Sequence, residues 1–156
     1  MIPRISEAPH LSQLAIQFLH ELQQQGFTGD TGTSYAERLS MATDNSIYQL
    51  LPQAVIFPRS SADVQIITRV AGQDKYRELS FTPRGGGTGT NGQSLTEGIV
   101  VDMSRYMNRI LEINPEQGWV KVEAGVIKDQ LNQFLKPYGY FSLRSYPQVT
   151  VRHWAG

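Results

Sequence analysis

Cysteine is absent from the 156-residue sequence. This absence excludes disulfides, thiol nucleophiles and cysteine metal ligands within the chain. Long apolar runs are missing as well: no window approaches the roughly 18 apolar residues of a membrane span, and the N-terminus lacks the apolar core of a signal peptide. The sequence therefore predicts no membrane insertion and favours a cytoplasmic location.

The chain also lacks net charge. Fourteen lysines and arginines balance 14 aspartates and glutamates, so the formal net charge is zero. No general attraction to nucleic acid is expected. The three histidines, His10, His20 and His153, have no carboxylate or cysteine cluster beside them, so a metal site is not expected. With 40% apolar and 18% charged residues, the composition is that of an ordinary globular domain.

Apolar spacing predicts helices at 11–22, 60–71 and 127–135, and a short helix around 35–39. Short strands are predicted at 54–57, 79–82 and 98–104, followed by a pair at 108–114 and 118–125 with a turn at 115–118. Residues 30–45 are interpreted as polar and turn-rich. The order of strand, helix, strand, loop and strand predicts a small α/β unit with a parallel sheet.

Glycine is concentrated in one stretch, Phe81–Ser94, with the sequence FTPRGGGTGTNGQS. Gly87, Gly89 and Gly92 spell G-x-G-x-x-G, but a Rossmann site needs a helix after the loop. Only residues 93–97 separate the loop from the next strand, too few for such a helix. The loop also has no lysine for a P-loop.

A loop between two strands can still bind phosphate through its backbone. Glycines permit conformations in which consecutive N–H groups converge into an anion-binding nest. Thr88 and Thr90 add hydroxyl donors, Asn91 an amide and Arg84 a charge, while Pro83 stiffens the entry. The other interpretation is a mobile surface loop, or a tight turn that needs glycine for steric reasons alone.

Four motifs together resemble the FAD-binding domain of the vanillyl-alcohol-oxidase/PCMH-type flavoproteins: LPQAVIFPRSSADV, FTPRGGGTGTNGQS, GIVVDMSRYMNRILEIN and VKVEAGV. They cover about Leu51 to Tyr140, in the family's order and spacing. The resemblance implies an α+β fold, namely the first lobe of the PCMH-type FAD-binding fold: a small α/β sheet with flanking helices, preceded by an N-terminal helix. The predicted segments are 1–50 (N-terminal helical extension), 51–141 (first lobe) and 142–156 (tail).

In such proteins the glycine loop wraps the pyrophosphate of FAD. The resemblance assigns that role to Pro83, Arg84, Gly85, Gly86, Gly87, Thr88, Gly89, Thr90, Asn91 and Gly92. It also places Pro58 near the adenine side. For Trp119 and Tyr140, ordinary packing or surface exposure is favoured over stacking on a flavin. Asp102 is interpreted as a turn residue and Glu123 as part of a strand's solvent face, not as an acid–base pair.

The N-terminal helix and the stretch GDTGTSYAERLSMATDNSIYQ further resemble the start of large bacterial D-2-hydroxyglutarate dehydrogenases. These proteins couple an FAD half to a C-terminal iron–sulfur half. The resemblance thus implies FAD, a small 2-hydroxy-acid substrate in the parent protein, and a 4Fe–4S cluster only in the parent's C-terminal part. No catalytic residue is assigned to this chain.

The last residues, Ser142–Gly156, depart from the family, which continues with a stretch like F-A-P-E-L-S-T-G-N-R-A-T-L-G-G-M. Loss of one T from a coding string for that continuation yields this chain from Tyr140 onward, with a stop codon after Gly156. We therefore expect an out-of-frame tail on a frameshifted fragment, which sequencing of the gene across these codons tests.

Two functions remain open from the sequence. One is the pyrophosphate-binding lobe of an FAD-linked 2-hydroxy-acid dehydrogenase, in which hydride passes to the flavin. The other is a non-catalytic nucleotide- or phosphate-binding module, or an inactive remnant. In either case little activity is expected of the chain alone.

Overall fold

The structure is a computed structural model that describes residues 10–142 and 148–153. The chain forms two compact units, Met1–Asp102 and Met103–Gly156. The predicted segments 1–50, 51–141 and 142–156 have other bounds, and that division stays a prediction. So does the out-of-frame origin of the tail, of which residues 143–147 and 154–156 lie outside the described residues.

The first unit contains a four-stranded sheet in the order β1-β2-β4-β3. The strands are β1 (Asp30–Gly32), β2 (Ala54–Phe57), β3 (Phe81–Arg84) and β4 (Ile99–Asp102). β4 runs parallel to both β2 and β3, as the sequence predicts. β1 was not predicted, because Asp-Thr-Gly has neither an apolar run nor alternation; antiparallel pairing with Val55–Phe57 makes it a strand.

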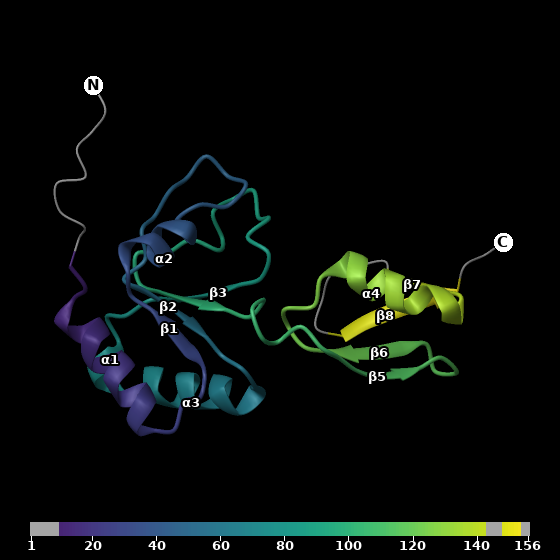
Figure 1. Ribbon diagram of the computed structural model, residues 1–156, viewed down its shortest axis with the longest axis horizontal. Helices are drawn as coiled ribbons and strands as arrows, with labels where there is room; N and C mark the ends of the chain where they lie inside the picture. The colour runs from purple at the N-terminus through teal and green to yellow at the C-terminus, as the bar shows by residue number, and fades with distance from the viewer. Residues whose placement is uncertain (1–9, 143–147, 154–156) are drawn as a thin grey trace. The chain divides into compact units, whose positions relative to one another are not determined.

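The helices of this unit are α1 (Gln13–Gln24), α2 (Tyr35–Ser40) and α3 (Ser61–Ala71), followed by the short 3-10 helix η1 (Asp74–Tyr76). Each α-helix begins after a serine whose hydroxyl accepts a backbone N–H from the first turn. α1 and α3 lie together on one side of the sheet, and α2 lies on the other (Figure 1). Every residue of β2 and β4 is buried, so both faces of the sheet centre are covered.

Residues 85–98 connect β3 to β4. Since the two strands are parallel, this segment crosses from the carboxyl end of β3 back to the start of β4. There the Ile99 N–H donates to the Ser80 carbonyl (2.8 Å), and the Gln53 N–H donates to the Gly98 carbonyl (2.7 Å). The crossover contains no helix, which confirms that a Rossmann arrangement does not fit.

The second unit contains an antiparallel sheet in the order β5-β6-β8-β7. Its elements are β5 (Ile110–Asn114), β6 (Trp119–Val122), α4 (Lys128–Leu135), the 3-10 helix η2 (Lys136–Tyr138), β7 (Tyr140–Ser142) and β8 (Gln148–His153). The predicted turn at 115–118 is confirmed, with Gly118 at φ +68°.

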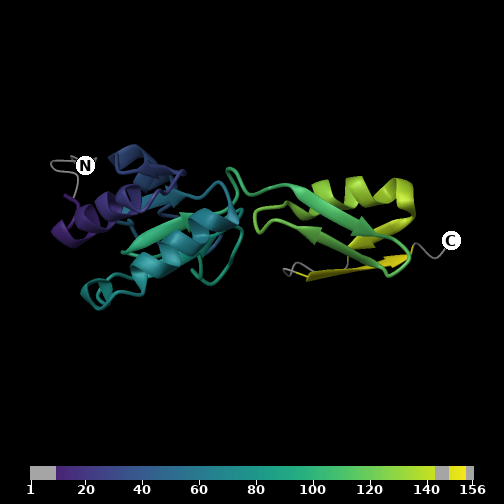
Figure 2. The same cartoon turned by 90° about the horizontal axis from the view of Figure 1, so that it is seen from below.

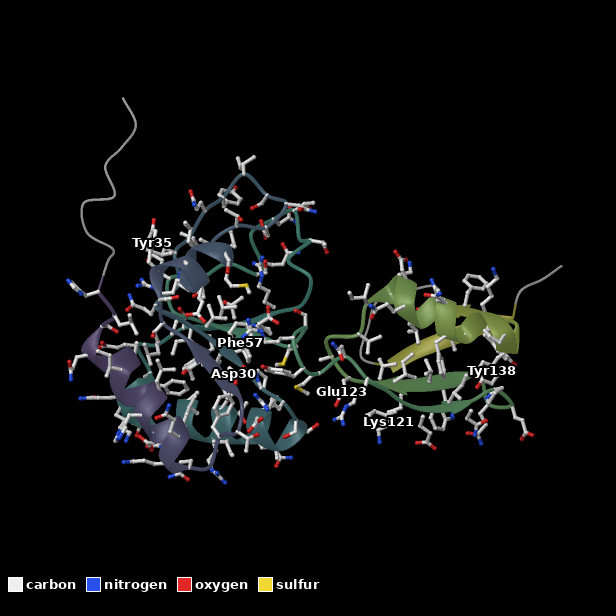
Figure 3. All side chains as sticks on the ribbon, in the orientation of Figure 1. Asp30, Tyr35, Phe57, Lys121, Glu123 and Tyr138 are labelled. Atoms are coloured by element: carbon white, nitrogen blue, oxygen red, sulfur yellow. The ribbon has the colours of Figure 1, made fainter. Side chains whose placement is uncertain are left out.

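α4 lies along one face of this second sheet (Figure 2). Val120 of β6 packs with Leu131 and Leu135 of α4 to form the core of the unit. Lys121, one position along β6, lies on the face opposite α4 (Figure 3). Of the apolar residues that predict a helix at 127–135, Leu131 and Leu135 are buried, whereas Ile127 and Phe134 are exposed.

Candidate functional site

The glycine loop, residues 85–92, begins at the carboxyl end of β3. β2, β3 and β4 are parallel, so their carboxyl ends share one edge of the sheet, where ligands of α/β proteins bind. The predicted strand at 79–82 is two residues too early, and Pro83 and Arg84 belong to β3. Pro83 is exposed on this edge strand, where a missing N–H costs no ladder hydrogen bond.

The backbone of the glycine loop presents a run of unused donors. Within the described residues, no N–H group from Gly85 through Thr90 donates a hydrogen bond. The run ends at Asn91, whose N–H donates to Gln93 Oε1 (3.1 Å). Gly87 has φ +63°, a conformation that bends the chain and that glycine adopts without strain. These N–H groups can therefore donate to an anion without breaking any internal bond.

Arg84 is used inside the protein. Its side chain is 9% exposed; Nη2 donates to the Thr43 carbonyl (2.8 Å) and Nη1 to the Ser94 hydroxyl (3.3 Å). Ser94 Oγ in turn donates to Asp44 Oδ2 (3.2 Å). The sequence predicts that Arg84 offers its charge to a phosphate. In the structure its guanidinium lies beneath the loop and is bonded to the segment that precedes β2.

The other predicted loop residues divide into two groups. Thr88, Thr90 and Asn91 are exposed, so their polar side chains are accessible to a ligand. Gly89 and Gly92 serve the fold: the Gly89 carbonyl accepts the Asn45 N–H (3.0 Å), and Gly92 lies against the Tyr48 ring. The contact with residues 43–48 was not predicted, because no local pattern in a polar stretch reveals a partner so distant in sequence.

The turn after β2 is fastened at the same edge of the sheet. Asp63, 1% exposed, accepts the backbone N–H groups of Thr28 and Arg59, at 2.8 Å each, and the Thr28 hydroxyl. Ser60 accepts the Asp63 N–H, but the Asp63 carboxylate bonds to the N–H of Arg59 rather than that of Ser60, so the two residues do not form a capping box. Pro58, placed near the adenine side by the resemblance, is fully buried.

Two carboxylates differ from their predicted settings. Glu123 is 8% exposed instead of solvent-facing, and it accepts hydrogen bonds from the Arg109 backbone N–H (2.9 Å) and guanidinium (2.6 Å to Nη2) (Figure 3). Arg109 holds the pKa of Glu123 below its ordinary value. Asp102 is not a turn residue but ends β4, where it is buried. Burial of both follows from tertiary pairing that strand alternation alone does not reveal.

The two aromatic candidates are held within the second unit. Trp119 donates its indole N–H to Gln117 Oε1 (2.8 Å), and the Tyr140 hydroxyl donates to the Pro115 carbonyl (2.7 Å). Tyr140 also packs against the core around Val120. Tyr140 is thus a packing residue, and the Trp119 hydrogen bond lies at the surface, in agreement with packing or surface exposure for the two.

Residues 52–151 match the family model described as the FAD binding domain. The chain belongs to this family. Its members bind FAD, and the fold, the carboxyl-edge loop and the lack of a Rossmann helix agree with that membership. In the part of the chain that the structure describes, no helix is long and apolar enough to cross a membrane.

Among full-length relatives, the chain is 74% identical over 141 residues to the D-2-hydroxyglutarate dehydrogenase of Escherichia coli, which covers 90% of this chain and 14% of that protein. It is 56% identical over 141 residues to the Haemophilus influenzae protein of the same name, with the same two coverages. The chain thus spans about a seventh of the length of these relatives.

Solved structures show the same fold. An alkyldihydroxyacetonephosphate synthase superposes with a TM-score of 0.71 at 19% identity, covering 86% of this chain and 29% of that one. The 4-ethylphenol oxidase of Gulosibacter chungangensis superposes with a TM-score of 0.63 at 24% identity, covering 83% and 26%. At such identities the likeness concerns the fold alone.

The residues of the loop fit the pyrophosphate of FAD. Unpaired N–H donors run from Gly85 to Thr90, and the two glycines at the start of the run have open space beside them. A Cβ built on Gly85 meets nothing within 4 Å, and one on Gly86 meets only Thr88 Cγ2 at 3.7 Å. A phosphate group can thus approach this backbone directly.

Proposed function

We propose that the chain is the part of an FAD-linked 2-hydroxy-acid dehydrogenase that holds the FAD pyrophosphate, with D-2-hydroxyglutarate as the substrate of the whole protein. The unpaired backbone donors of Gly85 to Thr90, at the carboxyl edge of the parallel sheet, carry this proposal. The substrate is inferred from the dehydrogenases that the chain resembles.

Each residue of the loop has a role in this proposal. The N–H groups from Gly85 to Thr90 donate to the phosphate oxygens, and Thr88, Thr90 and Asn91 add side-chain donors from exposed positions. A hydrogen bond to a charged group is worth about 1.5–3 kcal/mol, so several of them hold a pyrophosphate on a chain without net positive charge. Gly92 follows the last donor and packs against Tyr48, and Pro83 and Arg84 fix the first residue of the nest to β3.

When bound, FAD would supply the group that accepts hydride in the oxidation of a 2-hydroxy acid. The contribution of this chain is to bind and orient the cofactor. Its loop is anchored at both ends to adjacent parallel strands, so the donors are held in place before the ligand arrives. Such preorganisation lowers the entropic cost of binding.

Calorimetric titration of the purified chain with FAD, FMN and ADP tests the proposal. FAD is expected to bind most tightly, because it offers both the pyrophosphate and the flavin. Inorganic pyrophosphate should compete with FAD, since both use the same N–H groups. Equal affinities for all three nucleotides would favour a general phosphate-binding module, and no saturable heat with FAD would contradict the proposal.

A further inference from the structure

Arg84 connects three separate segments of the first unit. Its guanidinium lies below the glycine loop and donates from two different nitrogens, to the Thr43 carbonyl and to Ser94 Oγ. Ser94 continues the chain of hydrogen bonds to Asp44. The side chain therefore joins the end of β3 to the segment before β2 and to the far side of the crossover.

A second connection closes the arrangement into a ring. Asn45, directly after Asp44, donates its N–H to the Gly89 carbonyl at the top of the loop (3.0 Å). Residues 43–45 are thus bonded both to Arg84 at the base of the loop and to Gly89 within it. We call Arg84, Thr43, Asp44, Asn45 and Ser94 the loop brace.

Gly87 packs directly against the Arg84 side chain of the loop brace. A Cβ at Gly87 would lie 2.6 Å from Arg84 Cζ, so the loop backbone rests directly on the guanidinium. The guanidinium is bonded to two acceptors, and Arg84 as a residue is 9% exposed, so the loop backbone packs on a fixed group. The unpaired donors begin at Gly85, the residue after Arg84.

The charge of Arg84 is balanced inside the protein. Hydrogen bonds from Ser46, together with Ser94 and the positive charge of Arg84, hold the pKa of Asp44 below its ordinary value. Asp44 is therefore ionised at neutral pH and faces the guanidinium through Ser94. The pair offers an anion above the loop much less net charge than a free arginine would.

We propose that Arg84 is a positioning residue: through Thr43 and the Ser94–Asp44 bond it fixes the glycine loop in its anion-binding shape, and it does not pair with the phosphate itself. The inference rests on the proposed function of the loop. It adds residues 43–45, which lie far before the loop in sequence, to the binding site.

Exchange of the Asn45 backbone amide, measured by NMR on the chain without ligand, tests the brace alone. Arg84→Gln is expected to speed this exchange by about tenfold, the effect of losing one net hydrogen bond to a charged group. Arg69→Gln removes an equal charge from an exposed position on α3 and should leave Asn45 unchanged. Unchanged exchange in Arg84→Gln would overturn the proposal.

Affinity for FAD separates a positioning role from a direct ionic one. Asp44→Asn removes a negative charge from the surroundings of the anion, so simple electrostatics expects tighter binding. If the loop brace positions the loop, Asp44→Asn should instead weaken FAD binding, because the Ser94–Asp44 link that supports the loop is weakened. Arg84→Lys retains the charge but cannot reach two acceptors with a fork of donors, so it should not restore affinity.

Ser94→Ala removes a single link and serves if Arg84→Gln does not fold. It should weaken FAD binding in the same direction and by less. Full affinity in Arg84→Lys, or tighter binding in Asp44→Asn, would overturn the brace. If the unmodified chain bound no FAD while Asn45 exchange still responded to Arg84→Gln, the proposed function would fail and the positioning of the loop by Arg84 would stand.

Discussion

Two glycines of the same loop carry different constraints. Gly87 has positive φ and rests on the Arg84 guanidinium, so its lack of a side chain serves the fold. Gly85 has neither constraint: its φ lies outside the left-handed region, and no atom lies within 4 Å of a Cβ built there. Because the fold does not require glycine at position 85, the absence of a side chain there can serve the approach of a ligand to the backbone.

The pair Gly85→Ala and Gly87→Ala separates these roles. Gly87→Ala should lower the free energy of unfolding by about 1–2 kcal/mol, the cost of alanine in a left-handed conformation, and should displace Arg84 as well. Gly85→Ala should leave stability unchanged but weaken FAD binding, because its methyl group meets the phosphate. Urea unfolding and calorimetry measure the two effects.

Gln65→Ala, at an exposed position of α3, is the control for both measurements. Wild-type FAD affinity in Gly85→Ala would show that no ligand approaches this backbone. Wild-type stability in Gly87→Ala would show that Arg84 does not support the loop.

At the scale of elements, one carboxylate joins α1 to the segment after α3. Glu21 of α1 pairs with Lys75 Nζ (2.6 Å) and accepts hydrogen bonds from Gln73 (2.7 Å) and the Tyr76 hydroxyl (2.8 Å). Phe18, one turn earlier, packs edge-on against the Tyr76 ring, 5.2 Å between centroids. These contacts fasten the two helices that cover one face of the first sheet (Figure 1).

This junction predicts a pH dependence of stability. Lys75 first, then Gln73 and Tyr76, lower the pKa of Glu21 to about 2. A carboxyl group whose pKa is lower in the folded state stabilises the fold above its unfolded value of about 4.5, and this contribution disappears as pH falls toward 2.

Glu21→Gln should therefore be less stable than wild type at pH 7, and the difference should shrink between pH 5 and pH 2. Urea unfolding across this range measures it, with Glu78→Gln at an exposed position of the same unit as the control. A constant difference across the whole range would contradict the assignment.

At the scale of the whole molecule, the chain has two compact units with separate cores. The first carries the parallel sheet and the glycine loop. The second carries the antiparallel sheet, in which Arg109 and Glu123 form a half-buried ion pair. The chain covers 14% of its E. coli relative, so cofactor binding and substrate turnover can be tested separately.

The purified chain is expected to bind FAD without oxidising D-2-hydroxyglutarate. Oxidation of a 2-hydroxy acid needs a base for the hydroxyl proton as well as the flavin. Asp44, the carboxylate of the loop brace, is not expected to act as this base, because it already accepts hydrogen bonds from Ser46 and Ser94. Reduction of an electron-accepting dye by chain, FAD and D-2-hydroxyglutarate together would contradict this expectation; a full-length relative serves as the positive control.

Local patterns account for most of the predicted elements. The apolar stripe of α1, the serine before α3 and the continuous apolar run of β2 each reflect interactions within a few residues, so a single segment reveals them. β1 and the burial of Glu123 could not be predicted, because Asp30–Gly32 becomes a strand only beside Val55–Phe57, and Glu123 becomes buried only beside Arg109.

The sequence by itself determined the family, the glycine loop and its place between two strands, since these depend on residue order and on the backbone freedom of glycine. Only the tertiary structure decided what Arg84 does. A charged side chain beside a glycine loop can point outward to an anion or inward to the protein, and the choice depends on acceptors distant in sequence. Here the Thr43 carbonyl and the Ser94 hydroxyl bind the guanidinium inside, and the backbone N–H groups of the glycine loop keep no internal acceptor.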